Sequence, residues 1–325
     1  MAPPVECGGL APHACHGRQA CSYQAITLNA PMLKAVRNAC ASTAAWTLYQ
    51  VPRLERPYAH AAHAALGVPG LHTLFRETTD RLVARLAREG RTARRMCVGP
   101  LTPVFDVSSF TVKGWYFARV PYEPGATNLV LSTLDDADVF VDIGAHTGYF
   151  TVLAALSVGA RGRVFAFEPN PAVRQRLERH LALNAVVDRV EVSSLALGGE
   201  DTDDARLFVS CWPENDGIAS LTPAPETIAR GGLRDDAFIP ARVRTFDTWA
   251  QSAELTRIDL MKIDVEGAEV EVLRGMSATF ERVRPRRIIC ETQTASDAVR
   301  ILCGRGYRVS TLDEMPGGTP NLLFE

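Results

Sequence analysis

A glycine turn directly after an apolar run is the strongest chemical signal in the sequence. Residues 139–148 read V-F-V-D-I-G-A-H-T-G, and an apolar stretch typical of a helix follows from Tyr149. Such a turn lets a ligand approach backbone amides at a helix N-terminus. A pyrophosphate-binding G-x-G-x-x-G turn needs glycine at its second position, where this chain has His146. The turn therefore indicates a ligand without phosphate, with Asp142 binding its polar end; the alternative is that Asp142 only caps the next helix.

A second acid follows the next apolar run. Glu168 comes after Val164–Phe167 and before Pro169 and Asn170. A carboxylate at the end of the second strand of a nucleotide-binding sheet can accept hydrogen bonds from both ribose hydroxyls. Enzymes that bind NAD use the same device, so Glu168 indicates a nucleoside without choosing the cofactor; the alternative role, helix capping, suits Asn170 better. S-adenosylmethionine, which has an amino-acid end, a ribose diol and no phosphate, fits both acids.

Three further acids follow a third apolar run. Residues 258–269 read I-D-L-M-K-I-D-V-E-G-A-E, a pattern that predicts a buried strand, a turn and the start of a helix. Helical spacing prevents all three acids of the turn from pointing into one cleft. We expect Asp264 and Glu266 to face the cleft, at the group that is transferred from the cofactor. Glu269 ranks below them, because its side chain could instead interact with the dipole of the helix that begins there.

Together, the motifs D-I-G-A-H-T-G-Y-F, F-E-P-N-P, K-I-D-V-E-G-A-E and I-I-C-E resemble the FkbM family of methyltransferases from about Tyr122 to the C-terminus. The resemblance implies an α/β fold with the Rossmann-like sheet of class I methyltransferases, which is mostly parallel and has seven strands with an antiparallel terminal pair. It implies S-adenosyl-L-methionine as cofactor and S-adenosyl-L-homocysteine as product. It also implies O-methylation of a hydroxyl on a sugar or secondary metabolite, as in natural-product tailoring.

The same resemblance assigns roles to the motif residues. Asp142 and the glycines of the turn would hold the methionine end and Glu168 the ribose, while Asp264 and Glu266 would border the methyl group. The full set of expected cofactor contacts is Asp142, Gly144, Ala145, His146, Gly148, Glu168, Pro169, Asn170, Ala196 and Asp264. No metal ligand is expected.

Two departures from the family pattern affect the catalytic assignment. The family usually has Asn where this chain has His146, and it often has His two residues after the acid that ends the fifth strand, where this chain has Glu291-Thr292-Gln293. A base expected at that histidine is absent, so Glu291 and His146 become alternatives.

Methyl transfer is an in-line displacement in which the protein mainly positions the reacting atoms. A carboxylate that takes the proton of the acceptor hydroxyl contributes roughly a hundredfold or more. Our order of candidates for this base is Glu266, Asp264 and then Glu291, because mutual repulsion in a partly buried acid cluster raises the pKa of one member towards neutrality. The alternatives are N-methylation of a peptide or amino sugar, a non-catalytic nucleoside-binding scaffold, and an NAD-dependent oxidoreductase, for which the middle glycine is missing.

Alternating apolar runs and helical patterns predict the elements that position these residues. The predicted strands are Val139–Ile143, Val164–Phe167, Val190–Leu195, Ile258–Ile263, Arg287–Cys290, Tyr307–Leu312 and Asn321–Phe324. Asn170 and Ser296 suit helix N-caps, the second helix ending at Gly304, and Asn184 suits a left-handed C-terminal position. A strand or hairpin is expected between about Cys97 and Val120.

The chain divides into a leader with a helical extension, residues 1–95, and a catalytic domain, residues 96–325, with an insert at about 200–246 that overhangs the active-site edge. Helices are expected from Ala30 to about Arg91. The cluster Cys7, His13, Cys15, His16 and Cys21 lacks the paired spacing of zinc sites, and His60 and His63 are more often structural. Acceptor recognition is assigned to the insert residues Cys211–Ile239, among them Trp212, Asn215 and Phe238, and to Trp115, Tyr116 and Tyr122, for which ordinary packing is the alternative.

Composition excludes several classes of protein. A formal charge of −2 without a lysine or arginine block provides no footprint for nucleic acid. Neither a membrane-length apolar stretch nor a secretory signal pattern is present, and eight scattered cysteines among 325 residues do not form a disulfide framework. We therefore expect a cytoplasmic protein whose partner is a small acceptor, namely a sugar, polyketide or peptide natural product. The oligomeric state stays open, with a dimer as one alternative.

Overall fold

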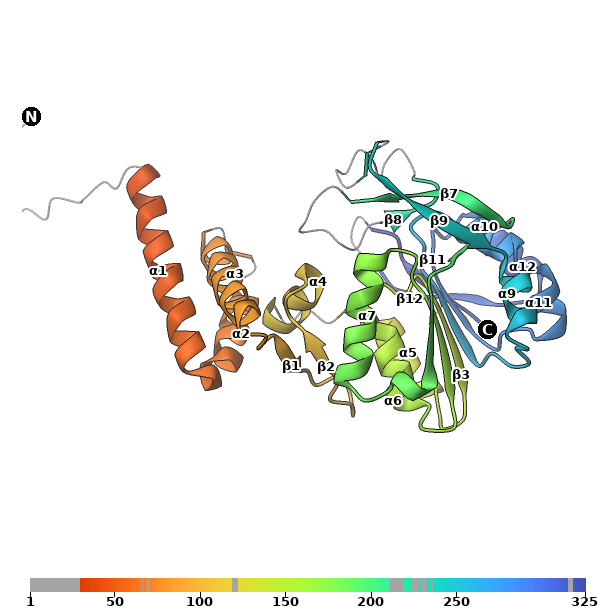
Figure 1. Ribbon diagram of the computed structural model, residues 1–325, viewed down its shortest axis with the longest axis horizontal. Coiled ribbons are helices and arrows are strands. Elements are labelled where there is room, and N and C mark those ends of the chain that lie inside the picture. The colour runs from red at the N-terminus through yellow and green to blue at the C-terminus, as the bar shows by residue number, and fades with distance from the viewer. Residues whose placement is uncertain are drawn as a thin grey trace, which may run out of the picture.

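Helices form the N-terminal part of the structure. The computed structural model describes residues 30–325 apart from 66, 69, 119–121, 211–218, 224–227, 229–232, 235 and 315–317. The first elements are α1 Ala30–Gln50, the short 3₁₀ helix η1 Pro52–Leu54, α2 Glu55–Ala64 and α3 Leu71–Arg88. They lie together at one end of the molecule (Figure 1) and confirm the helices expected between Ala30 and about Arg91. Across the described residues, every helix is too short or too polar to span a bilayer.

A small hairpin and two short helices connect this extension to the main sheet. Strands β1 Ala93–Arg95 and β2 Val104–Asp106 pair antiparallel, and α4 Phe110–Lys113 and the π-helix η2 Gly114–Ala118 follow. The prediction of strand structure between Cys97 and Val120 is right for β2 and wrong from Phe110 onward. The physical reason is a helix cap: the hydroxyl of Ser109 accepts a hydrogen bond from the amide of Val112 at 3.2 Å, which starts a helix where apolar content alone suggested a strand.

The main sheet has seven strands. In spatial order they are β12 Val309–Asp313, β13 Asn321–Phe324, β11 Ile288–Glu291, β10 Leu260–Ile263, β3 Val139–Ile143, β4 Arg163–Phe167 and β5 Val190–Ser193. Neighbours from β11 to β5 pair parallel, and β13 runs antiparallel to both β11 and β12. The order reverses between β10 and β3, a switch point at which open α/β sheets bind ligands. The expected Rossmann-like methyltransferase sheet is confirmed.

Helices cover both faces of this sheet, so that successive side chains of a strand enter different cores. Phe140 packs into a core that includes the helical extension and α5 Pro124–Thr133, α6 Tyr149–Ser157 and α7 Pro171–Leu183, whereas Val141 and Ile143 pack into the opposite core. That second core is covered by α9 Phe246–Ser252, α10 Glu269–Arg274, α11 Ser277–Arg282 and α12 Asp297–Gly304 (Figure 1). The extension thus shares a continuous core with one face of the sheet.

The insert forms a sheet of its own beside the main sheet (Figure 1). Its strands are β6 Ala196–Leu197, β9 Phe238–Arg244, β7 Thr202–Val209 and β8 Ala219–Ser220 in spatial order. A short 3₁₀ helix, η3 Val187–Arg189, precedes β5 on the main sheet. The expected insert residues Cys211, Trp212 and Asn215, like the cysteine and histidine cluster of residues 7–21, lie outside the described residues.

Helix ends largely follow the sequence signals. The Asn170 side chain accepts a hydrogen bond from the amide of Ala172, and Ser296 caps α12 in the same way, as predicted. The prediction for Asn184 is wrong: its φ is −102°, and the left-handed residue is Ala185, with φ 54°. Asn184 is instead recruited to bond both backbone groups of Val104 in β2, at 2.8 and 2.7 Å, a long-range contact that local sequence does not reveal.

Candidate active site

Three strand ends meet closely at the switch point. The amides of Gly144 and Ala145 donate to the carbonyl of Phe167 at 3.1 and 2.9 Å, and the amide of Asp264 donates to the carbonyl of Ile143 at 2.9 Å. Gly144 has φ 84°, and a Cβ built on it would lie 1.8 Å from the carbonyl oxygen of Asp264. Only glycine fits there, because the turn after β3 must pass directly beside the turn after β10.

Asp142, at the end of β3, is buried under this turn with an exposed fraction of 1%. The Thr151 hydroxyl in α6 donates to its carboxylate at 2.6 Å. Burial raises the pKa of Asp142 to about 6, although the nearby Lys262 ammonium and the Thr151 hydrogen bond oppose the rise. The carboxylate is therefore fixed by α6 at the base of the glycine turn.

Glu168, at the end of β4, is joined to the same turn. Its two carboxylate oxygens accept hydrogen bonds from the amides of His146 at 3.0 Å and Asn170 at 2.8 Å. Burial raises its pKa to about 7, against the effect of these two backbone donors. A carboxylate has about four acceptor positions, so two amides leave capacity for the two hydroxyls of a ribose. The turn, its glycine cradle and Glu168 thus fit a nucleoside that carries no phosphate.

A buried lysine organises the acids around the turn after β10. Lys262 is 2% exposed, and its ammonium donates to Asp264 at 2.6 Å and lies 3.6 Å from the carboxylate of Glu123. Burial alone would lower the pKa of Lys262, but Asp264, Glu123 and Asp142 raise it above its usual value. The ammonium also lies 4.8 Å from the ring centroid of Phe150 in α6. Lys262 is therefore a permanent cation that holds Asp264 in its ionised form.

Of the three candidate bases, only Glu266 combines partial exposure with a pKa near neutrality. Burial and the charges of Asp264 and Glu269 raise its pKa to about 7, and no described residue holds its carboxylate by a hydrogen bond or ion pair. Burial and Asp264 raise the pKa of Glu291 much further, to about 10, which keeps it protonated near neutrality. Asp264 has a lowered pKa because, despite its burial, Lys262 stabilises its charge.

The turn that carries Glu266 is held by the insert. Glu266 has φ 52°, a left-handed conformation, and its carbonyl accepts a hydrogen bond from the Ser220 hydroxyl at 2.7 Å. On the other side, Glu269 is 8% exposed and its carboxylate accepts from the amide of Gly267 at 2.9 Å. The Glu269 carboxylate therefore stabilises the turn that precedes α10, whereas its role as partner of the helix dipole stays a prediction.

The remaining predicted residues lie around the same edge in different surroundings. His146 has φ 50°, and burial lowers its pKa to about 4, so the ring is neutral near pH 7. Pro169 and Asn170 form the connection from β4 to α7, where Asn170 is the N-cap. Ala196 lies beyond the end of β5, in β6, where it is buried and pairs with Val243.

The sequence patterns do not identify three residues of this cluster as site residues. Lys262 stands inside the third motif, and a lysine in a buried strand is rarely stable without an anionic partner, which was a usable signal. Glu123 lies before α5, and Asn321 begins β13 and donates to the Glu123 carboxylate at 2.9 Å. No local pattern joins Glu123 and Asn321 to Lys262, because the sheet topology brings them together.

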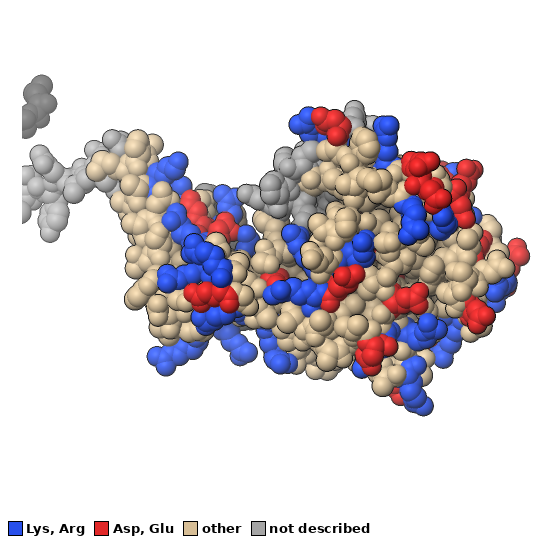
Figure 2. Space-filling view, viewed as in Figure 1, with Lys and Arg blue, Asp and Glu red and all other residues tan. Residues whose placement is uncertain are grey.

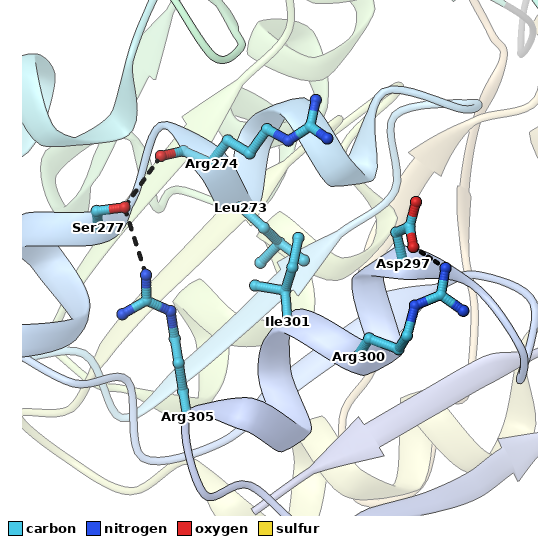
Figure 3. Close-up of a pocket in the computed structure, with 7 residues that line it drawn as sticks. All are labelled: Leu273, Arg274, Ser277, Asp297, Arg300, Ile301 and Arg305. Atoms are coloured by element: carbon cyan, nitrogen blue, oxygen red, sulfur yellow. Dashed lines mark hydrogen bonds and ion pairs between the residues drawn. The ribbon is translucent and has the colours of Figure 1, made fainter.

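A separate cavity of about 490 Å³ lies between α10, α11 and α12 (Figure 3). Leu273 and Ile301 contribute apolar surface, Arg305 donates to the Ser277 hydroxyl at 3.3 Å and Arg300 pairs with Asp297. It is lined by none of the predicted site residues, so the switch-point edge remains the candidate active site.

Comparison with known proteins identifies the family. The family model described as Methyltransferase FkbM domain matches residues 142–309. AMB antimetabolite synthetase AmbE of Pseudomonas aeruginosa is 31% identical over 201 residues, which cover 54% of this chain and 9% of AmbE. Hexuronic acid methyltransferase AglP of Haloferax volcanii is 27% identical over 181 residues, 54% of this chain and 66% of AglP. For 2-O-methyltransferase NoeI of Sinorhizobium fredii the identity is 27% over 165 residues, 48% of this chain and 64% of NoeI.

A Rossmann-like sheet with an acid and a glycine turn after its first strand and a second acid tied to that turn defines an S-adenosylmethionine-dependent methyltransferase domain. The chain belongs to the FkbM methyltransferase family. It spans less than two thirds of the length of AmbE, AglP and NoeI. When bound, the cofactor supplies a methyl group activated by the sulfonium charge; the residues that fit it are those of the glycine turn, Asp142 and Glu168.

Proposed function

We propose that this protein O-methylates a hydroxyl of a sugar or secondary metabolite and that Glu266 is its general base. The observation that carries the proposal is the contrast within the acid cluster. Asp264 is ion-paired to Lys262, Glu291 is protonated near neutrality, and Glu266 alone of the three combines a pKa of about 7 with a carboxylate unengaged by described residues.

Each residue has a distinct task in this proposal. The glycine turn and the Glu168 carboxylate tied to it orient the nucleoside, and Lys262 keeps Asp264 ionised beside the turn. Glu266, fixed through its carbonyl by Ser220, takes the proton of the acceptor hydroxyl. Because methyl transfer requires a linear arrangement of the reacting atoms, most of the rate enhancement comes from this positioning.

The relatives support an oxygen acceptor. AglP is named as a hexuronic acid methyltransferase and NoeI as a 2-O-methyltransferase. AmbE is named as an antimetabolite synthetase, in keeping with a role in natural-product tailoring. The acceptor proposed for this chain is accordingly a small hydroxyl compound.

The decisive experiment combines cofactor binding with product analysis. Calorimetry with S-adenosylmethionine should show binding, and incubation with isotopically labelled cofactor and a metabolite extract should yield a product heavier by one methylene, with NMR placing the methyl on oxygen. Glu266→Gln should keep cofactor affinity and lose about a hundredfold in kcat, whereas the exposed control Glu281→Gln should keep both.

Three other outcomes would each contradict one part of the proposed function. A methyl group found on nitrogen would favour the peptide or amino-sugar alternative, and cofactor binding without any product would favour the non-catalytic scaffold. Undiminished turnover in Glu266→Gln would remove Glu266 from the role of base.

A further inference from the structure

A cavity of about 470 Å³ lies between the helical extension and the catalytic domain. Its walls come from α2, β1 and the following turn, from η2, and from the N-terminal parts of α5 and α6. This volume falls within the usual range for small-molecule sites. Of the residues that line it, Tyr149 alone falls within the part of the chain matched by the family model, so the cavity lies almost entirely outside the matched part.

The inner wall of the cavity is aromatic. The ring centroids of Trp115 and Tyr122 are 4.4 Å apart, those of Trp115 and Tyr149 4.8 Å, and those of Tyr122 and Tyr149 5.0 Å. Trp115 and Tyr149 are almost fully buried in this cluster, so the rings are held rigidly. A rigid aromatic wall with polar tips suits the apolar face of a sugar or another hydroxylated ring.

The aromatic wall adjoins the candidate active site. Tyr149 directly follows Gly148 of the cofactor turn, and Tyr122 directly precedes Glu123, whose carboxylate lies 3.6 Å from the Lys262 ammonium. A ring placed against Tyr122 and Tyr149 is therefore next to both the cofactor turn and the acid cluster.

The outer rim of the cavity is basic. Arg56, His60 and Arg95 line it and are exposed, and none of its described lining residues is acidic. The nearby Glu55 does not compensate this charge, because Arg94 binds it through two nitrogens at 2.7 and 2.8 Å. Arg95 is oriented by hydrogen bonds from its guanidinium to Thr102.

The charge of the surrounding extension reinforces this rim. Residues 30–95 contain eleven lysines and arginines and four acids, and blue side chains are prominent over the extension in Figure 2. Their summed field attracts anions towards the cavity.

We infer that this cavity binds the methyl acceptor and that the acceptor is anionic: a hydroxylated ring of sugar size with a carboxylate or phosphate group that Arg56 and Arg95 bind. The planar guanidinium matches both groups. This inference rests on the proposed function for the identity of the ligand as acceptor, whereas the presence of an anion site can be measured by itself.

The test is calorimetry on the full chain without cofactor. Glucuronate and glucose 6-phosphate serve as the two anionic probes and glucose as the neutral probe of the same ring. One or both anions should bind at least about tenfold more tightly than glucose, and Arg56→Gln and Arg95→Gln should each remove about tenfold of that affinity. The anionic probe that binds more tightly shows whether the acceptor carries a carboxylate or a phosphate.

The matched control is Arg53→Gln, an exposed arginine of η1 outside the cavity lining, which should leave the affinity unchanged. Thermal melting of each variant verifies folding. Equal binding of glucose and both anions, or full anion affinity in Arg56→Gln and Arg95→Gln, would overturn the inference. Anion binding that depends on both arginines, together with a failure of S-adenosylmethionine to bind, would uphold the cavity and refute the proposed function.

Discussion

The two functional regions of this molecule use charge in opposite ways. At the switch-point edge, the acids and Lys262 are largely buried and fixed by hydrogen bonds from α6, the glycine turn and the insert. At the cavity under the extension, the aromatic rings are fixed while Arg56, His60 and Arg95 stand exposed at the rim. Buried charge is expensive unless it is fully paired, so the first region is the constrained one.

This difference separates two tasks. The edge must present one geometry to one cofactor, which requires that the groups around the cofactor turn be held in place by neighbouring residues. The cavity rim can change its side chains without disturbing a core, because exposed substitutions usually alter stability little. Acceptor selectivity is therefore expected to reside in the extension and chemistry in the sheet edge.

The largest loss of stability is expected when the cation of the acid cluster, Lys262, is removed. In Lys262→Met, Asp264 and Glu123 lose their buried counter-charge, and we expect the free energy of unfolding to fall by about 3–5 kcal/mol. Urea denaturation at pH 7 measures this loss, and Lys34→Met, an exposed lysine in α1, is the control. A loss below about 1 kcal/mol, the range of surface pairs, would show that the cluster is solvated rather than closed.

The second prediction concerns the cofactor side alone. Glu168→Gln replaces a carboxylate that accepts two amide hydrogen bonds and is proposed to bind the ribose. Glutamine lacks the negative charge that strengthens the bonds to the two amides and the proposed bonds to the ribose. We therefore expect S-adenosylmethionine binding to weaken by about a hundredfold. Calorimetry measures the affinity, and the exposed Glu281→Gln on α11 should leave it unaltered. Unchanged affinity in Glu168→Gln would remove the ribose role, while anion binding at the cavity should persist in this variant.

The same contrast explains what the sequence could predict. Each of the seven strands overlaps its predicted range because apolar runs, glycine turns and caps are local signals, and the edge is built from residues directly after those strands. The partners Glu123 and Asn321 of Lys262, and the bonds from Asn184 to Val104, come from segments that only the fold unites. The cavity was anticipated only through Trp115, Tyr116 and Tyr122, since its basic rim comes from elements far from any motif.

The third prediction uses pH to test the proposed base. The pKa of Glu266 is raised to about 7, and a general base must be deprotonated. Activity should therefore be full well above pH 7 and fall by about tenfold per pH unit below it. A profile of kcat from pH 5 to 9 measures this fall in activity below pH 7. The fall should be absent from the residual activity of Glu266→Gln. A flat wild-type profile across pH 7 would contradict the assignment.

The smallest expected effect lies at the joint between the two regions. His180 in α7 donates from Nδ1 to the carbonyl of Thr147 in the cofactor turn at 2.6 Å, and its Nε2 accepts from the amide of Asp106 in β2 at 3.0 Å. The bond from the Asp106 amide requires the neutral ring, because a protonated Nε2 cannot accept a hydrogen bond, and burial lowers the pKa of His180 below its usual value. The stability that the neutral ring contributes is fully present above the pKa of an unfolded histidine, about 6.5. It is lost as the pH falls towards the lower pKa of the folded state.

Protonation would leave the Asp106 amide without its acceptor, a cost of about 1 kcal/mol. Urea denaturation at pH 7.5 and pH 5 should show a smaller change in unfolding free energy for His180→Gln than for the wild-type chain, whereas His72→Gln, an exposed control on α3, should match the wild type. An identical pH dependence in His180→Gln would mean that the hairpin and the cofactor turn are held together without this histidine. The hairpin would then be joined to α7 through the bonds from Asn184 to Val104 and through the shared apolar core, and changes at the cavity would reach the cofactor turn through these contacts.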